Sequence, residues 1–115
     1  MKNTMKNTMK KRDEAATDVA EVVAALGLKT DMGREAMKLA VQFVRLLDQK
    51  QEDYGSANII ISGEQGVIVR SQDKICRLKN LLGKSGVNHE SVSDSWMDLA
   101  NYGIIGFMVH NKIWK

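Results

Sequence analysis

The chain has 115 residues, 43% of them apolar, so it is long enough for one domain with a modest core and is not disordered by composition. Its formal net charge is +3, but residues 1–12 contribute +5, which leaves 3 − 5 = −2 for the rest. A nucleic-acid-binding domain needs basic residues clustered on a folded face, so this distribution argues against one.

Cysteine content and hydropathy indicate a protein of the cytoplasm. Cys76 is the only cysteine, which excludes an intrachain disulfide, and we expect it to be a buried, unreactive thiol. No apolar run reaches the roughly 18 residues of a membrane span. The N-terminus also lacks the apolar core of a secretion signal. We therefore expect no membrane association.

Residues 1–12 repeat the motif MKNT and end in a basic cluster. They have no apolar face, which predicts a flexible or loosely helical basic arm that is dispensable for folding. A contact between this arm and nucleic acid or an anionic ligand is the alternative. The remainder, residues 13–115, is predicted to be a single all-α domain that resembles a four-helix bundle.

Apolar residues recur with helical spacing in four segments, at about 14–27, 32–51, 66–82 and 89–110. Gly27 is typical of a helix C-terminus, and Thr30 or Asp31 can cap the second helix. The absence of proline agrees with an all-α fold.

Residues 55–66 are the least regular part and contain the triplet Ile59-Ile60-Ile61. A single strand would have no sheet to join, so a packed loop or one helical turn is expected. Its glycines allow backbone N–H groups to approach a phosphate, and a plain connection between helices is the alternative.

The fourth helix is apolar on nearly all sides from Leu99 onwards, which is typical of a central helix or of a subunit interface. Gly103 and Gly106 predict close contact with another helix. This helix and the alanine-rich first helix carry more apolar surface than one small bundle covers, which predicts a homo-oligomer.

Charged residues form two rows with helical spacing. The first row is mostly cationic and the second is acidic: Arg70, Asp73, Lys74 and Arg77, then Glu90, Asp94 and Asp98. If the two helices pack antiparallel, these rows converge on one pocket. Lys50, Asp53 and Tyr54 would lie at its rim. Asn101 and Tyr102 continue the acidic face.

This pairing predicts a site for a nucleotide or another phosphate-bearing small molecule. The acidic row offers oxygen ligands, which suit Mg²⁺, and the cations would neutralise phosphate charge. A zinc site is not expected, because His89 and His110 are far apart in the chain. Purely structural, solvated ion pairs are the alternative, and no catalytic residue can be named.

Several motifs together resemble the first nucleotide-modification-associated domain family, which is common in bacteriophages. The motifs are Asp53-Tyr54-Gly55, Gly63 to Gly66, Arg70-x-x-Asp73-Lys74-x-x-Arg77-Leu78 and Glu90-Ser91-x-x-Asp94-x-x-x-Asp98-x-x-x-Tyr102. The resemblance covers about residues 45–110.

More distantly, the chain is similar to the MazG-like all-α nucleoside triphosphate pyrophosphohydrolases, which use acidic helices to hold Mg²⁺. It departs from their E-x-x-E pattern, because Glu52 and Asp53 are adjacent. The resemblance implies a Mg²⁺-dependent enzyme acting on nucleotides. A phage sponge that sequesters a host signalling nucleotide, and a structural bundle, are the alternatives.

Overall fold

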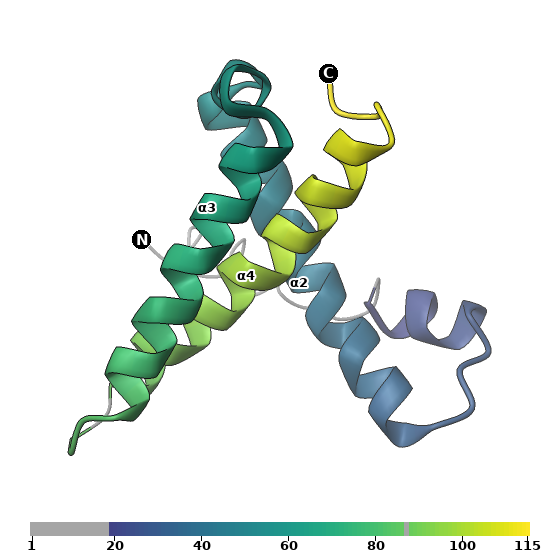
Figure 1. The fold of residues 1–115 in the computed structure, drawn as a ribbon. Helices are drawn as coiled ribbons and strands as arrows, with labels where there is room; N and C mark the ends of the chain where they lie inside the picture. The colour runs from purple at the N-terminus through teal and green to yellow at the C-terminus, as the bar shows by residue number, and fades with distance from the viewer. Residues whose placement is uncertain (1–18, 87) are drawn as a thin grey trace, which may run out of the picture. The chain divides into compact units, whose positions relative to one another are not determined.

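The computed structural model describes residues 19–86 and 88–115. A short helix over residues 19–25 is followed by three long helices. These are α2 (Asp31–Tyr54), α3 (Ala57–Leu82) and α4 (His89–His110), and they are shown in Figure 1. The predicted all-α fold is therefore confirmed, and the described residues contain no strand. The predicted basic arm, residues 1–12, lies outside the described residues.

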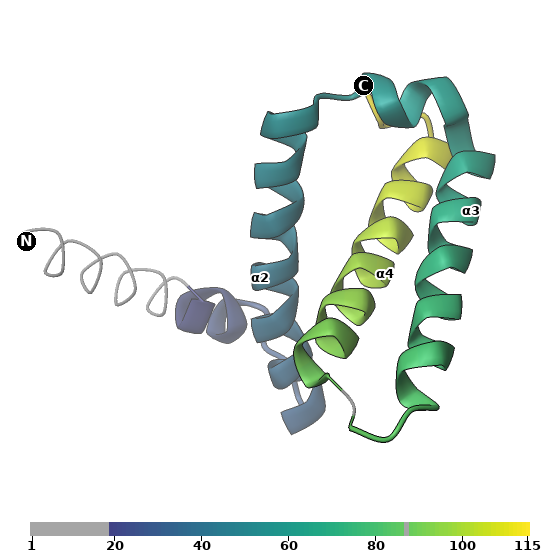
Figure 2. The same cartoon turned by 90° about the vertical axis from the view of Figure 1, so that its left-hand side faces the viewer.

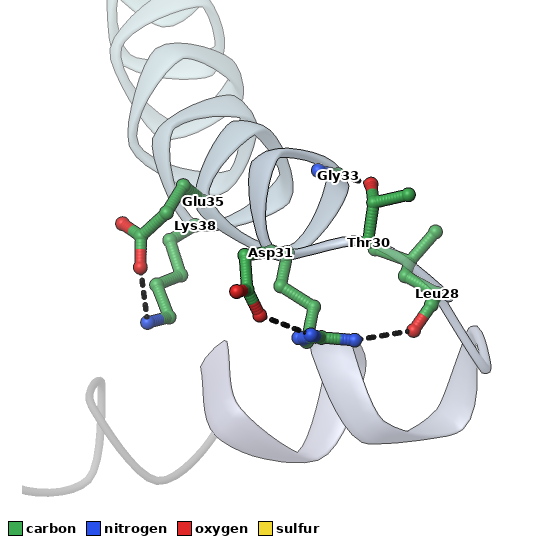
Figure 3. A network of polar contacts seen from close by, with 7 residues as sticks. Leu28, Thr30, Asp31, Gly33, Glu35 and Lys38 are labelled. Atoms are coloured by element: carbon green, nitrogen blue, oxygen red, sulfur yellow. Dashed lines mark hydrogen bonds and ion pairs between the residues drawn. The ribbon is translucent and has the colours of Figure 1, made fainter.

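The chain divides into two compact units, residues 1–42 and residues 43–115. In the first unit, hydrogen bonds organise the start of α2, as Figure 3 shows. The Thr30 hydroxyl accepts a hydrogen bond from the backbone N–H of Gly33 at 2.9 Å, so Thr30 acts as the predicted cap. The Arg34 guanidinium donates to the carbonyl of Leu28 at 2.8 Å and pairs with Asp31, which joins the helix to the preceding loop.

In the second unit, α3 and α4 lie side by side (Figures 1 and 2). Their contact is close near Gly106, where an added Cβ would lie 3.5 Å from Cγ1 of Val67. Val67 and Leu78 are buried on α3. The expectation of close helix contact is thus confirmed at Gly106. At Gly103 an added Cβ would meet nothing within 4 Å, so this expectation is wrong for the single chain.

Helix α3 spans Ala57–Leu82, but Gly63 has a non-helical conformation that divides it into two helical segments. Of the two expectations for residues 55–66, the helical turn is therefore confirmed and the packed loop is wrong. The carbonyl of Ser56 accepts hydrogen bonds from the N–H groups of Ile59 and Ile60, which starts the helix. Gly63, with φ of 63° and ψ of −159°, interrupts it with a kink that a residue with a side chain rarely adopts. The apolar triplet is helical, and Ile59 is buried without a neighbouring strand.

Cys76 is exposed, and the prediction of a buried thiol is wrong. Its neighbour Ile75 is also 42% exposed. Both residues lie on a part of α3 that the described residues leave uncovered.

Candidate functional site

The second unit contains a pocket of about 290 Å³ between the end of α2, the start of α3 and the middle of α4. Its lining combines charged, amide and aromatic side chains with an apolar floor. The lining residues are Leu47, Lys50, Gln51, Tyr54, Gly55, Asn58, Ile59, Arg70, Asp98, Asn101, Tyr102, Ile105 and Trp114.

A three-residue charge cluster ties the helices together at this pocket. The Asp98 carboxylate on α4 lies 2.8 Å from Nζ of Lys74 on α3 and 3.2 Å from Nζ of Lys50 on α2. The side chains of Asp98 and Lys74 are only 18% and 22% exposed, so water screens this pair less than a surface pair. One carboxylate is therefore shared by two cations, which leaves the cluster with a net charge of about +1.

The two lysines also determine the ionisation of Asp98. Burial raises the pKa of this carboxyl, but hydrogen bonds from Lys74 and Lys50, together with their positive charges, lower it by more. The pKa of Asp98 consequently lies below the ordinary value of an aspartate, and Asp98 is ionised at neutral pH.

Asn101 lies one turn after Asp98 and is 6% exposed. Its amide nitrogen donates to the carbonyl of Phe43 at 3.0 Å, and because a carbonyl only accepts, this contact defines the orientation of the amide. Within the described residues, the buried Oδ1 of Asn101 has no hydrogen-bond partner. A buried acceptor without a partner is costly, and its place in the pocket lining makes it a candidate acceptor for a bound group.

The segment after α4 folds back onto the junction between α2 and α3. The Trp114 indole N–H donates to the carbonyl of Ser56 at 3.3 Å, and the Ser56 hydroxyl accepts from the Gln51 amide at 2.6 Å. The Ser56 hydroxyl also donates to the carbonyl of Lys115. These bonds place the Trp114 ring in the pocket wall.

Arg70 and the aromatic residues complete the lining. Nη2 of Arg70 donates to the carbonyl of Asn58 at 3.3 Å, and within the described residues the guanidinium has no carboxylate partner. Tyr102 is partly buried, whereas Tyr54 is 72% exposed. The pocket lining thus includes both a guanidinium group, from Arg70, and aromatic rings.

The structure brings together only part of the predicted site. Lys50, Tyr54, Arg70 and Tyr102 line the pocket, as does Asp98, and Lys74 reaches it through its ion pair. The other predicted residues do not belong to the lining and are exposed: Asp53, Asp73, Arg77, Glu90 and Asp94. The two rows therefore meet at one ion pair and do not face each other along their length.

Of the three predicted metal ligands, only Asp98 lines the pocket. Across residues 19–86 and 88–115, no group of three or more histidine, cysteine, aspartate or glutamate side chains is placed to hold a metal ion. A Mg²⁺ ion here would need to draw most of its ligands from a phosphate compound and water.

Sequence reasoning missed several lining residues, among them Gln51, Asn58 and Trp114. Asn101, which follows Asp98 by three residues, was placed on the acidic face by its spacing but was not named as a binding residue. Trp114 offers no such signal, because it reaches the pocket through the path of the segment after α4.

Comparisons with protein families, curated proteins and solved structures find no match to this chain. The family resemblance therefore stays a prediction that depends on the quoted motifs. Among the helices of the described residues, none is both long and apolar enough to cross a membrane.

Proposed function

We propose that the protein binds a nucleotide or a related phosphate-bearing small molecule in the pocket of residues 43–115. The observation that carries this proposal is the combination of Lys50, Arg70 and three aromatic residues in one pocket of about 290 Å³. A guanidinium forms two parallel hydrogen bonds to a phosphate, and aromatic rings stack on nucleobases. The net positive charge of the Lys50–Asp98–Lys74 cluster favours an anion.

Each part of a nucleotide has a counterpart in the lining. Arg70 would bind the phosphate, and Tyr102 and Trp114 would contact the base or sugar. The unpartnered Oδ1 of Asn101 would accept a hydrogen bond from an N–H or O–H group of the ligand, after a small movement that exposes this atom. This last contact would select ligands that carry a donor at that place.

Hydrolysis and sequestration remain two versions of this proposal. In the first, Asp98 and the ligand phosphates would hold Mg²⁺, and the ion would supply an activated water for a pyrophosphohydrolase-like reaction. In the second, the protein is a non-catalytic sponge for a signalling nucleotide, with an anti-defence role for a bacteriophage in the host cytoplasm. The engagement of Asp98 by two lysines favours the sponge, because a metal ion would have to displace an ammonium group.

Self-association is part of the proposal. Among the described residues of 43–115, the buried apolar side chains are only Ile59, Val67 and Leu78. Such a small core supports little stability by itself, and small chains commonly compensate by forming oligomers.

A thermal-shift screen of nucleotides and cyclic dinucleotides, with and without Mg²⁺, tests ligand binding. A ligand at 100 times its Kd should stabilise the fold by about 2.7 kcal/mol. Arg70→Gln should weaken binding by about tenfold or more, since a hydrogen bond to a charged group contributes roughly 1.5–3 kcal/mol.

The matched control is Arg77→Gln, which removes the same charge from the same helix at an exposed position outside the lining. It should leave the Kd within about twofold, because only a weak long-range charge effect remains. Equal losses in both variants would mean that the binding depends on general charge and not on this pocket.

Testing whether a bound nucleotide is converted to products distinguishes hydrolysis from sequestration. Turnover that requires Mg²⁺ and is abolished by Asp98→Asn supports the enzyme. Tight binding without Mg²⁺ and without turnover supports the sponge.

A further inference from the structure

Helix α4 has an uncovered apolar stripe. Trp96, Ile104 and Phe107 are 55%, 39% and 68% exposed, and the small residues Ala100 and Gly103 between them are exposed as well. Trp96, Ala100 and Ile104 are four residues apart, and Gly103 and Phe107 follow Ala100 at intervals of three and four, so all five lie on one side of the helix. An exposed aromatic pair in line with other apolar residues is typical of an interaction surface.

The stripe faces away from the pocket. Asp98, Asn101 and Ile105 mark the side of α4 that lines the pocket. With 100° of rotation per residue, the centre of the stripe near Gly103 lies about 160° from the centre of that side. Ligand binding and any contact through the stripe therefore use different sides of the same helix.

Helix α3 continues this apolar surface. Val67, Lys74 and Leu78 mark the side of α3 that meets α4. Ile68, Ile75 and Leu82 repeat every seven residues, lie next to that side and away from Arg70, and are 44%, 42% and 57% exposed. Because α3 and α4 are antiparallel neighbours (Figure 2), this edge adjoins the α4 stripe. We call the combined surface the outer face.

The apolar residues of the outer face supply most, but not all, of the area of a standard dimer interface. Trp96 and Phe107 expose on the order of 300 Å², taking ~250 Å² for a full aromatic side chain. The aliphatic residues of the outer face bring this to about 600 Å², close to the ~800 Å² per partner of a standard interface. Neighbouring residues at the rim would supply the remainder.

The order of side chain sizes along the stripe makes it complementary to the same stripe on a second copy of the chain. The aromatic residues Trp96 and Phe107 lie at the two ends, and the small residues Ala100 and Gly103 lie in the middle, with Ile104 at the edge of the stripe beside Gly103. When two such helices cross antiparallel, each large end meets the other large end, and the small centres allow the backbones to approach. The stripe also carries no Asp, Glu, Lys or Arg, so pairing it with itself leaves no charge buried.

We propose that the outer face is the interface of a symmetric homodimer, with its two-fold axis near Ala100 and Gly103. This proposal rests on the proposed self-association and assigns it to one surface. Trp96 of one subunit would pack against Phe107 of the other, and the two pockets would open on the opposite sides of the dimer. An isologous contact of this kind closes and does not propagate into fibres.

Gly103→Glu tests the interface without harming the single chain. An added Cβ at Gly103 meets nothing within 4 Å, and glutamate is a better helix former than glycine. Light scattering should give about twice 12.8 kDa for the wild type and 12.8 kDa for the variant. The dimer dissociation constant should rise at least a hundredfold, because two carboxylates would meet at the axis.

Asn80→Glu is the matched control. Asn80 is exposed on the side of α3 that is turned away from α4, and the change adds the same charge. This variant should remain a dimer. Dissociation of both variants would show that charge alone controls association and would overturn the assignment to the outer face.

A disulfide test keeps the proposal falsifiable if Gly103→Glu fails to fold, which circular dichroism would show. In a Cys76→Ser background, Gly103→Cys should form a covalent dimer on mild oxidation, and Asn80→Cys should not. A wild type that is monomeric at 100 µM would overturn both self-association and this interface. A wild-type oligomer that neither changes with Gly103→Glu nor crosslinks at Gly103→Cys would overturn the interface alone.

Discussion

The two sides of α4 differ in how far the single chain itself provides partners for their side chains. On the pocket side, Asp98 has two cationic partners and Asn101 donates to a backbone carbonyl of α2. On the other side, Trp96 and Phe107 are more than half exposed. Burying polar groups without partners is costly, and on the pocket side only Oδ1 of Asn101 lacks a partner within the described residues. An exposed apolar side chain can instead be buried by a second molecule. This contrast is the basis of the two proposals, which are a small ligand on one side of α4 and a second subunit on the other.

The largest expected effect is a difference in folding stability between substitutions at two glycines of α4, Gly106 and Gly103. Gly106→Leu should destabilise the fold by about 2–3 kcal/mol, because the added side chain would press into Val67 across the contact with α3. Gly103→Leu should be neutral or stabilising by up to about 1 kcal/mol in the single chain, since its surroundings are open. Denaturant unfolding at several protein concentrations measures both and separates the folding of the chain from its association. Equal destabilisation in both variants would mean that the two sides of α4 do not differ as described.

A smaller effect is expected from the charge cluster. Asp98→Asn should lower the free energy of unfolding by about 1–2 kcal/mol, because it leaves Lys50 and Lys74 close together without an anion between them. Asp94→Asn, on the same helix but exposed, should change it by less than about 0.5 kcal/mol. Thermal unfolding of the two variants side by side measures the difference. A neutral Asp98→Asn would mean that the cluster contributes nothing to holding α2 and α3 against α4.

The smallest effect concerns pH. Burial raises the pKa of Asp98, but the hydrogen bonds from Lys74 and Lys50 and the positive charges of these lysines together lower it by more, so this pKa is lower in the folded chain than in the unfolded chain. The stabilisation by this carboxylate should therefore be complete above pH ~4, near the ordinary pKa of an aspartate, and be lost as the pH falls through the lower folded value. Stability measured from pH 7 to pH 2.5 should fall less steeply below pH 4 in Asp98→Asn than in the wild type. Parallel curves would show that Asp98 does not contribute to the acid sensitivity.

Local sequence signals predicted the helices well and their junctions less well. Periodic apolar residues located all three long helices, and Thr30 was recognised as a cap. The segment before Gly63 was predicted only as a loop or one helical turn, because three consecutive isoleucines next to several glycines do not distinguish a helix from a loop. The non-helical conformation of Gly63 separates this short helical segment from the long part of α3.

The candidate site was predicted in part for a similar reason. Helical spacing placed Arg70 with Lys74, and Asp94 with Asp98, on common faces, and Lys50 and Tyr54 were expected at the rim. Spacing describes one helix at a time, however. It gives neither the angle at which two helices cross nor which residues lie opposite each other where they meet. The structure brings Lys74 to Asp98 and leaves Arg77 and Asp94 outside the pocket.

The sequence by itself determined that this chain is helical, where the long helices lie, and which of their residues are charged or apolar. Those properties depend on residues within a few positions of one another, so they can be derived from propensity and period. Only the tertiary structure decided that Asp98 is shared by Lys50 and Lys74, that Trp114 joins the pocket, and that Gly103 lies in the open while Gly106 is packed. These contacts join residues up to 59 positions apart in the chain, as in the bond between Ser56 and Lys115, and they depend on how whole helices pack together.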